Sequence, residues 1–323
     1  MTNCLITGGA GFIGSHLAEQ LLEGGHNVTV IDDLSTGRFE NIKHLTDHSD
    51  FHFAIDTITN EVVLDRLASE CEVIFHLAAT VGVRLVVENP VLTIETNFKG
   101  TEAVLKTALR YRAKVIITSS SEVYGKGNAF PFNEGDDVLF GPTLNNRWTY
   151  AGSKMMDEFL ALAYHEEKGL PVVICRLFNT IGPRQTGRYG MVVPRFVKQA
   201  LKGEPITVYG DGKQRRSFTW VGDVVKALMQ LSKTPEAVGD VFNVGHEKDI
   251  SILELAALIK DLTSSSSEIA LIPYEEVYND GFEDMRRRLP DISKISHLIG
   301  YQPTLDLQDI LERVIEYEKE RLE

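Results

Sequence analysis

The chain has 323 residues, 43% of them hydrophobic, which suits one or two globular domains with a large core. Its formal net charge of −13 disfavours a nucleic-acid partner or an anionic membrane surface, while local arginines still allow an anionic small substrate. The sequence has neither a signal-peptide pattern nor a long apolar span, so we expect a cytoplasmic protein. Cys4, Cys71 and Cys175 form no CxxC pair and lie in or beside apolar stretches, which predicts buried, reduced thiols and no metal site.

The first half of the chain alternates between strand-like and helix-like segments. Its apolar runs show little polar alternation, which is typical of strands that are covered on both faces. Such runs predict strands at 3–9, 27–33, 72–79, 114–120 and 171–179. Amphipathic segments predict helices at 14–25, 97–112 and 150–169. This alternation of strands and helices indicates an α/β fold with a Rossmann-type, doubly wound parallel sheet.

The regular alternation of predicted strands and helices ends after Asn179. A loop rich in glycine and arginine is followed by a predicted helix, a hairpin-like segment and two further helices, at 180–190, 193–204, 206–223, 251–266 and 309–323. We expect residues 1–179 to form the first domain and to receive roughly 217–250. Residues 180–323 would then form a smaller, discontinuous C-terminal α/β domain that binds substrate over the carboxyl ends of the parallel strands.

A glycine motif joins the first strand to the first helix. The stretch ITGGAGFIGSH contains Gly8, which permits a tight turn, Gly11, which lets a pyrophosphate approach a helix N-terminus, and Gly14, which lets that helix lie close to the sheet. Asp32 ends the second strand, roughly 20 residues further on. A carboxylate there hydrogen-bonds ribose hydroxyls and repels a 2′-phosphate, so NAD is the expected cofactor.

Other residues are candidates for contact with the cofactor. Asp56 is either a ligand near the adenine or a surface turn aspartate, and Asn97 is either a direct ligand or a buried structural residue. The full set of further candidates is Phe12, Ile13, Asp33, Ser35, Thr36, Gly37, Asp56, Leu77, Ala78, Ala79, Asn97 and Ser119, together with Tyr150 and Lys154.

The stretch RWTYAGSKMMDE supplies a candidate base. Tyr150 and Lys154 are four residues apart, which places them on one face of a helix. A lysine ammonium and an oxidised nicotinamide both favour the phenolate form of a nearby tyrosine. Tyr150 is therefore a plausible base near neutral pH.

At this point the chain resembles the nucleotide-sugar branch of the extended short-chain dehydrogenase/reductase family. The resemblance covers essentially the whole length and rests on GGAGFIG, HLAA, SSSEVYG, YAGSK, RLFNTIGPR, VYGDGKQRRSF and RRRLPDISK. It implies a bound NAD that oxidises sugar C4 to a ketone, after which the sugar is epimerised, dehydrated or decarboxylated. It also implies a homodimer joined through the helical segments near 97–112 and 153–167.

The resemblance assigns roles to individual residues. Tyr150 would be the base at the C4 hydroxyl, Lys154 would hold the nicotinamide ribose, and Ser120 or Ser121 would bind the sugar hydroxyl. The remaining substrate-binding candidates are Asn179 and Arg216 at the diphosphate, Tyr209 near the nucleobase, and Arg184 and Arg288 elsewhere in the substrate site. Arginines suit this task because their guanidinium groups make bidentate contacts with phosphates and carboxylates.

Glu122 divides the candidate reactions, because a 4-epimerase needs no carboxylate after the serines. The pair Ser121–Glu122, the approach FGPTLNNRWTY and the segment GFEDMRRRLPDI, which carries Arg288, resemble UDP-glucuronate decarboxylases. Two stretches depart from that group: RLFNTIGPR looks more like the general xylose-synthase and epimerase pattern, and HLAATVGVRLVVENP is a version shared by many epimerase-like sequences. We therefore expect decarboxylation of UDP-glucuronate to a UDP-pentose of the UDP-xylose type. The alternatives are a UDP-sugar 4-epimerase, a 4,6-dehydratase and a non-catalytic NAD-sensing scaffold.

Overall fold

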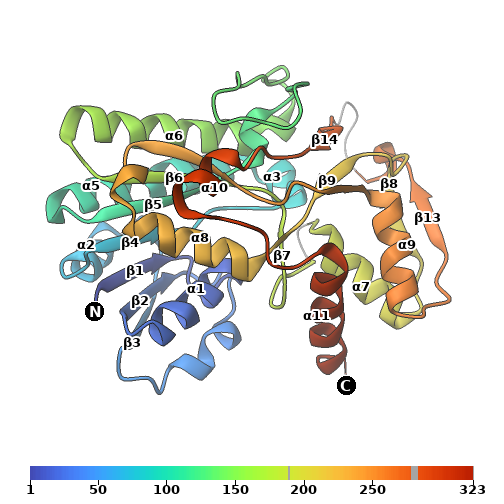
Figure 1. Cartoon of the computed structure of the whole chain (residues 1–323), viewed down its shortest axis with the longest axis horizontal. Coiled ribbons are helices and arrows are strands. Elements are labelled where there is room, and N and C mark those ends of the chain that lie inside the picture. Colours follow the sequence, from blue (N-terminus) through green and yellow to red (C-terminus); the bar gives the residue numbers. More distant parts are fainter. Residues whose placement is uncertain (188–189, 278–282, 323) are drawn as a thin grey trace.

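Seven parallel strands form the central sheet of the structure, a computed structural model that describes residues 1–187, 190–277 and 283–322 (Figure 1). Every neighbouring pair in this sheet is parallel. In spatial order the strands are β11 (Asp240–Val244), β6 (Val172–Leu177), β5 (Lys114–Ser120), β4 (Val73–His76), β1 (Asn3–Thr7), β2 (Asn27–Asp32) and β3 (Phe51–Ile55). This order confirms the predicted doubly wound α/β sheet.

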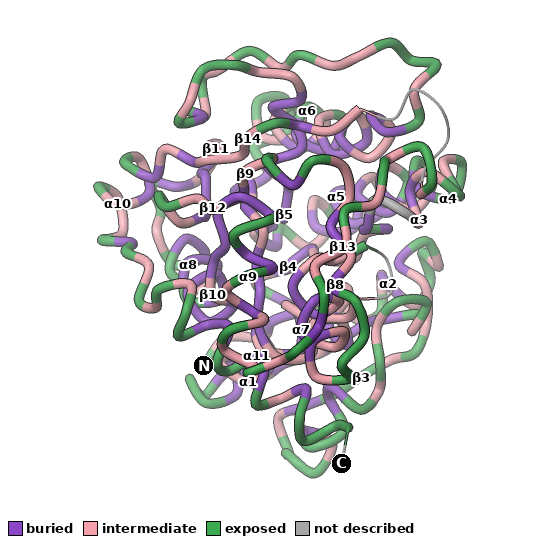
Figure 2. Tube along the Cα trace, turned by 90° about the vertical axis from the view of Figure 1, so that its right-hand side faces the viewer, coloured by how far each residue is buried: buried purple, intermediate pink, exposed green. Residues whose placement is uncertain are grey.

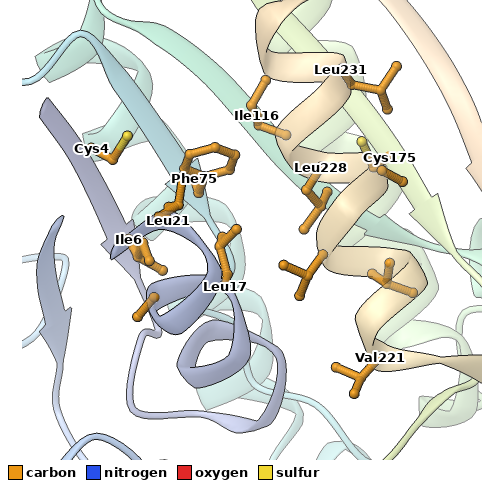
Figure 3. Packing of buried hydrophobic residues seen from close by; sticks show 14 of the residues in the cluster. Cys4, Ile6, Leu17, Leu21, Phe75, Ile116, Cys175, Val221, Leu228 and Leu231 are labelled. Carbon is orange, nitrogen blue, oxygen red and sulfur yellow. The ribbon is translucent and has the colours of Figure 1, made fainter. Parts of the chain in front are cut away.

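Helices cover both faces of the sheet, because its strands carry apolar side chains on both sides. On one face, Ile6, Phe75 and Ile116 meet Leu17 and Leu228 from the covering helices (Figure 3). This face is covered by α1 (Phe12–Glu23), α8 (Val221–Lys233) and α10 (Ser293–Ile299). The opposite face is covered by α2 (Glu61–Ala68), α5 (Gly100–Tyr111) and α6 (Thr149–Lys168). Figure 2 shows that β4 and β5 run through the buried interior.

Two strands of the sheet come from segments where no strand was predicted. β3 extends the edge beside β2, and its residues His52, Phe53 and Ile55 keep partly or largely exposed side chains. β11 pairs with β6 at the other edge, although it follows β6 by more than sixty residues. The division of the chain into two domains remains a prediction.

A smaller group of elements lies beside the sheet, at the right of Figure 1. Its core joins three helices, α7 (Val192–Lys202), α9 (Ile252–Leu262) and α11 (Leu307–Glu320). Short strands complete it in three small sheets: β8 (Ile206–Tyr209) with β13 (Ile269–Ile272); β9 (Arg215–Ser217) between β12 (Asp249–Ser251) and β14 (Arg287–Arg288); and β7 (Thr180–Ile181) with β10 (Thr219–Trp220). Capping boxes at Ser251 and Asp306 begin α9 and α11.

The predicted hairpin at 206–223 is wrong. β8 pairs in parallel with β13, while β9 pairs with β12 and β14. Gly210 and Gly212, both at φ +68°, turn the chain between β8 and β9 so that the two strands join different sheets. Their partners come from later segments, which a local turn signal does not reveal.

The remaining elements are short. On the side of the sheet covered by α6 lie α3 (Val83–Glu88), α4 (Pro90–Ile94) and a π-helical turn, η3 (Glu95–Lys99). The 3₁₀ turns are η1 (Phe39–Asn41), η2 (Lys43–Leu45), η4 (Ser121–Tyr124), η5 (Asn146–Trp148), η6 (Pro235–Ala237) and η7 (Tyr274–Glu276). Within the described part of the chain, no helix combines the length and apolar character needed to cross a lipid bilayer.

The close approach of α1 to the sheet depends on Gly14. A Cβ atom at this position would lie 2.3 Å from the carbonyl oxygen of Gly8 and 2.7 Å from the Cα of Gly9. Both obstacles are backbone atoms of the preceding loop, so they cannot move aside as a side chain can. The first turn of α1 is thereby held against the glycine loop.

We expect Gly14→Ala to lower the free energy of unfolding by about 1–3 kcal/mol, because the added methyl group overpacks the loop. Gly152→Ala in α6 is the matched control: a Cβ there meets nothing within 4 Å. The control should raise stability by up to about 1 kcal/mol through helix propensity. Chemical denaturation measures both values, and a Gly14→Ala protein as stable as the parent contradicts this account of the loop.

Candidate active site

A cavity of about 630 Å³ lies at the carboxyl ends of the parallel strands. Its walls include the residues that follow or end β1, β2, β4, β5 and β6, and residues of α7, β8 and β9 close it from the other side. Open parallel sheets bind ligands at this end of their strands. The predicted cofactor and substrate residues therefore have a common place to meet.

Most of the predicted site residues line this cavity. They are Gly8, Gly11, Phe12, Ile13, Gly14, Asp32, Asp33, Ser35, Thr36, Asp56, Leu77, Ala78, Ala79, Ser119, Ser120, Ser121, Glu122, Tyr150, Lys154, Asn179, Tyr209, Arg216 and Arg288. Their contact with a ligand remains a prediction, but they line one cavity.

Three predicted residues do not line the cavity. Gly37 lies against Asp32, where a Cβ atom would come within 2.7 Å of the carboxylate. Asn97 accepts a hydrogen bond from the Thr80 amide at 2.8 Å and donates one to Ser153 at 2.9 Å, so its amide bridges two elements of the protein. The guanidinium of Arg184 donates to Glu19 of α1 at 2.5 Å.

The glycine loop is built to receive a close-lying backbone or ligand. Gly8 has φ +74°, and a Cβ atom on it would lie 2.8 Å from the amide nitrogen of Ala78. The Asp32 carboxylate accepts the amides of Ala10 and Leu34, each at 2.9 Å, which ties the loop to the end of β2. Burial raises the pKa of Asp32, and these backbone donors oppose the change.

Tyr150 and Lys154 stand one turn apart on α6, as the spacing predicts. Lys154 is buried, and its Nζ donates to Asp157 Oδ2 at 3.1 Å. Burial and the charge of Glu122 raise the pKa of Tyr150, whereas the Ser120 hydroxyl beside it acts in the opposite direction. The phenol therefore needs additional positive charge, such as a cationic ligand, before it can serve as a base near neutral pH.

The three serines have different surroundings. Ser119 donates to Glu158, a carboxylate that Arg176 also holds through two nitrogens. Ser120 caps η4 by accepting the Glu122 amide at 3.2 Å. The Ser121 hydroxyl is buried and has no hydrogen-bond partner among the described residues. Of the three, Ser121 has the hydroxyl most in need of a ligand.

Glu122 lies in a buried group of charges. Arg147 donates to both of its oxygens, at 2.5 and 3.0 Å, and Arg288 donates to one of them at 2.9 Å. Burial alone would raise the pKa of Glu122, but the two guanidiniums outweigh that cost and lower it to about 2. Glu122 is therefore ionised throughout the neutral range and acts as a fixed anion.

Sequence reasoning did not identify Arg147 and Asp284 as site residues. Arg147 is 3% exposed, and besides Glu122 it contacts Asp284 at 3.5 Å. Asp284 in turn accepts from Arg216 at 2.8 Å. The available signals were positional, since Arg147 precedes Tyr150 by three residues and Asp284 precedes Arg288 by four. The two stretches that resembled decarboxylases therefore touch in space.

The far end of the cavity has a different character. The Tyr209 ring lies under the guanidinium of Arg195, with 4.0 Å between the ring centroid and Cζ. Asn179 donates its side-chain amide to the carbonyl of Ser217 at 2.8 Å and faces the cavity beside Arg216. Flat aromatic and guanidinium surfaces suit a nucleobase, and the adjacent arginine suits a phosphate group.

Comparison with known proteins identifies relatives over nearly the full length. The family described as GDP-mannose 4,6 dehydratase matches residues 5–314. The UDP-N-acetyl-alpha-D-glucosaminuronate decarboxylase of Bacillus cytotoxicus is 43% identical over 98% of this chain and 98% of that protein. The UDP-glucuronic acid decarboxylase 1 of Danio rerio is 38% identical over 99% of this chain and 73% of that protein.

A solved structure is also similar. The UDP-glucuronic acid 4-epimerase from Bacillus cereus, in complex with UDP-glucuronic acid and NAD, superposes with a TM-score of 0.89 and 31% identity, covering 99% of each chain. The resemblance stated from the motifs is confirmed by these relatives and by the shared fold. The chain belongs to the GDP-mannose 4,6 dehydratase family of extended short-chain dehydrogenases/reductases.

Proposed function

We propose that this chain is an NAD-dependent UDP-hexuronate decarboxylase, which converts UDP-glucuronate to a UDP-pentose of the UDP-xylose type. The observation that carries the proposal is the buried group formed by Glu122, Arg147 and Arg288 beside Tyr150. It places positive charge where a sugar carboxylate can lie, within the same cavity as the base. Decarboxylases among the relatives support this reading.

The residues of the glycine loop fit NAD. Gly8 and Gly14 leave room that a Cβ atom would fill, and the N-terminus of α1 faces the cavity at Gly11. Asp32 lines the same space with a carboxylate suited to ribose hydroxyls. When bound, NAD would accept the hydride from sugar C4 and return it after carbon dioxide has left.

The groups of α6 act on the sugar hydroxyl. Tyr150, as phenolate, removes the proton of the C4 hydroxyl, and its own proton later returns to that oxygen. Lys154 lies one turn further along the same helix face and pairs with Asp157, so the positive charge of a bound oxidised nicotinamide would be what favours the phenolate. Ser121, whose buried hydroxyl has no partner in the described part of the chain, completes the contact with the sugar.

Loss of carbon dioxide follows from the ketone at C4. The C6 carboxylate is then β to a carbonyl group, so the C5–C6 bond breaks and its electron pair moves into the enolate that ends on the C4 oxygen. A proton must next reach C5. Burial lowers the pKa of Arg288, and the positive charge of neighbouring Arg216 lowers it further. The negative charge of Glu122 acts in the opposite direction, and the resulting pKa is about 10. Arg288 is therefore a better proton donor than an ordinary arginine.

Two further candidates have specific support. The 43% identical relative acts on UDP-N-acetylglucosaminuronate, the same reaction with an acetamido group on the sugar. The similar solved structure is a 4-epimerase of UDP-glucuronic acid, which would keep the carboxylate. All three readings share a carboxylated UDP-sugar, so the nature of the product distinguishes them.

We also propose a homodimer in a reducing compartment such as the cytoplasm. Val91 and Ile94 of α4 and Phe159 of α6 expose half or more of their surface, at 68%, 50% and 60%, on neighbouring helices. Such an apolar patch is typical of a subunit interface. Three unpaired, buried cysteines support the assignment of the compartment.

The first prediction concerns the product. Incubation with NAD and UDP-glucuronate should release carbon dioxide and form a UDP-pentose, which NMR spectroscopy identifies. UDP-N-acetylglucosaminuronate, tested in parallel, decides the substituent at sugar C2. Formation of UDP-galacturonate without loss of carbon contradicts the proposal and makes the protein a 4-epimerase.

The second prediction concerns the base. Tyr150→Phe should lower kcat by about 10²–10⁴ because the C4 hydroxyl loses its proton acceptor. Binding of NAD, followed by calorimetry, should remain. Tyr164→Phe, on the same helix but outside the cavity, is the control and should retain full activity. A Tyr150→Phe protein with parental kcat rules out this role.

The third prediction concerns Glu122. Glu122→Gln should abolish turnover of UDP-glucuronate and destabilise the fold by about 3–5 kcal/mol, because Arg147 and Arg288 lose their buried counter-charge. Glu95→Gln, an exposed change on η3, is the control.

The pH dependence tests the same residue. The folded pKa of Glu122, about 2, lies below its ordinary value of 4.5. Its stabilisation is thus complete above pH 4.5 and is lost as the pH falls towards 2. The stability difference between the parent and Glu122→Gln should be constant above about pH 5 and shrink in more acidic buffer. A difference that does not change with acidification contradicts the ionised, arginine-held state.

A further inference from the structure

Five buried or partly buried charges in the cavity wall alternate in sign. Arg288 contacts Glu122 at 2.9 Å, Glu122 is held by Arg147 at 2.5 Å, Arg147 reaches Asp284 at 3.5 Å, and Asp284 accepts from Arg216 at 2.8 Å. We call this row of ion pairs the alternating charge row. Its two ends, Arg288 and Arg216, each contact one carboxylate, whereas Arg147 at the centre contacts both.

The central arginine is the most enclosed of the three. The side chain of Arg147 is 3% exposed, compared with 6% for Arg216 and 13% for Arg288. Its two terminal nitrogens point to the carboxylates of Glu122 and Asp284. Both terminal nitrogens are thus committed to protein anions, and only the buried Nε of Arg147 lacks a hydrogen-bond partner among the described residues.

Arg147 also joins two distant parts of the chain. It belongs to η5, which leads directly into α6 and Tyr150. Its neighbour Trp148 donates its indole N–H to Glu283 at 3.0 Å, so that adjacent residues hold Glu283 and Asp284. The segment that carries Arg288 is thereby fastened to the start of the helix that carries the base.

The alternating charge row has three positive groups and two negative ones. A buried excess of one positive charge is costly unless an anion completes it. All five residues of the row line the cavity, and its two ends, Arg288 and Arg216, are the arginines that contact one protein carboxylate each. The proposed substrate would bring two anionic groups to this wall, a sugar carboxylate and a diphosphate.

We propose that Arg147 is a positioning residue that couples the two ligand-binding ends of the alternating charge row. Through Glu122 it orients Arg288 towards the sugar carboxylate, and through Asp284 it orients Arg216 towards the diphosphate. This inference rests on the proposed function for the identity of the ligand. The coupling itself concerns binding and can be measured without turnover.

A second consequence involves the protonation of Glu122. Glu122 faces Arg147 from η5, Tyr150 from α6, Arg288 from β14 and Arg216 from β9. Arg147 is the strongest of the influences that lower the pKa of Glu122 against the effect of burial. Without Arg147, that pKa rises, and Glu122 titrates closer to neutral pH.

The experiment compares variants in a Tyr150→Phe background loaded with NAD, so that no turnover disturbs binding. Calorimetry gives the Kd of UDP, which probes the Arg216 end, and of UDP-glucuronate, which probes both ends. Arg147→Met should raise the Kd of UDP-glucuronate by at least ~10-fold and the Kd of UDP by a smaller factor. Arg215→Met, which removes an arginine on β9 that pairs with Asp249 outside the cavity, should leave both Kd values unchanged.

The pH profile separates positioning from a purely structural role. The Kd of UDP-glucuronate in Arg147→Met should show an inflection at higher pH that the parent lacks, because burial then raises the pKa of Glu122 with one guanidinium fewer to oppose it. Adding Glu122→Gln should remove the inflection, and Arg147→Lys, which keeps the positive charge, should not show it. Parental Kd values in Arg147→Met, or weakened binding without the inflection, overturn the proposal.

Folding is checked by thermal unfolding of each variant. If Arg147→Met does not fold, Arg147→Lys carries the binding test, because a single ammonium cannot bridge two carboxylates as a guanidinium does. Arg147→Lys should then bind UDP-glucuronate at least ~5-fold more weakly than the parent, and a value within twofold overturns the proposal. If the unsubstituted protein, with Tyr150 present, binds UDP-glucuronate without converting it, the proposed function fails while the coupling remains measurable.

Discussion

The bidentate contact between Arg147 and Glu122 is the interaction on which the active-site wall depends. It keeps a carboxylate ionised in a place where burial alone would protonate it. That ionised carboxylate is what holds Arg288 in the cavity. Buried ion pairs contribute little net stability, because desolvation offsets their attraction. Their value here lies in geometry, since removing one partner leaves the others without a counter-charge.

The fold places this contact beside the other working parts of the site. Parallel strands bring the glycine loop, Asp32 and the serines to one edge of the sheet. α6 crosses the same edge with Tyr150 and Lys154, and the small sheet around β9 closes the opposite wall. One helix N-terminus, one helix face and one strand pair therefore enclose a single cavity. The architecture is common to many reactions, and the charged wall is what favours a carboxylated sugar.

The parts that sequence predicts well are those whose physics is local. The turn at Gly8, the close approach at Gly14 and the spacing of Tyr150 and Lys154 depend on neighbouring residues, and the structure places them as predicted. Arg147 escaped notice because its ion-pair partners lie in other segments: Glu122 is 25 residues earlier, and Asp284 belongs to the distant segment that carries Arg288. The hairpin at 206–223 failed for the same reason, since β8 and β9 pair with later segments and β10 pairs with the earlier β7. No local pattern records such partners.

The position of β11 has a consequence for the order in which the protein takes shape. During synthesis the amino-terminal strands emerge first, but β6 remains an open edge until residues 240–244 arrive to pair with it. Arg288 and Asp284 emerge later still, so Glu122 and Arg147 have only each other in a partly made chain. A nearly complete nascent chain thus has the strands β1 to β6 and β11, while the cavity wall still lacks Asp284 and Arg288. The charged wall is complete only when about the last tenth of the sequence packs against the first half and Asp284 and Arg288 pair with Arg147 and Glu122.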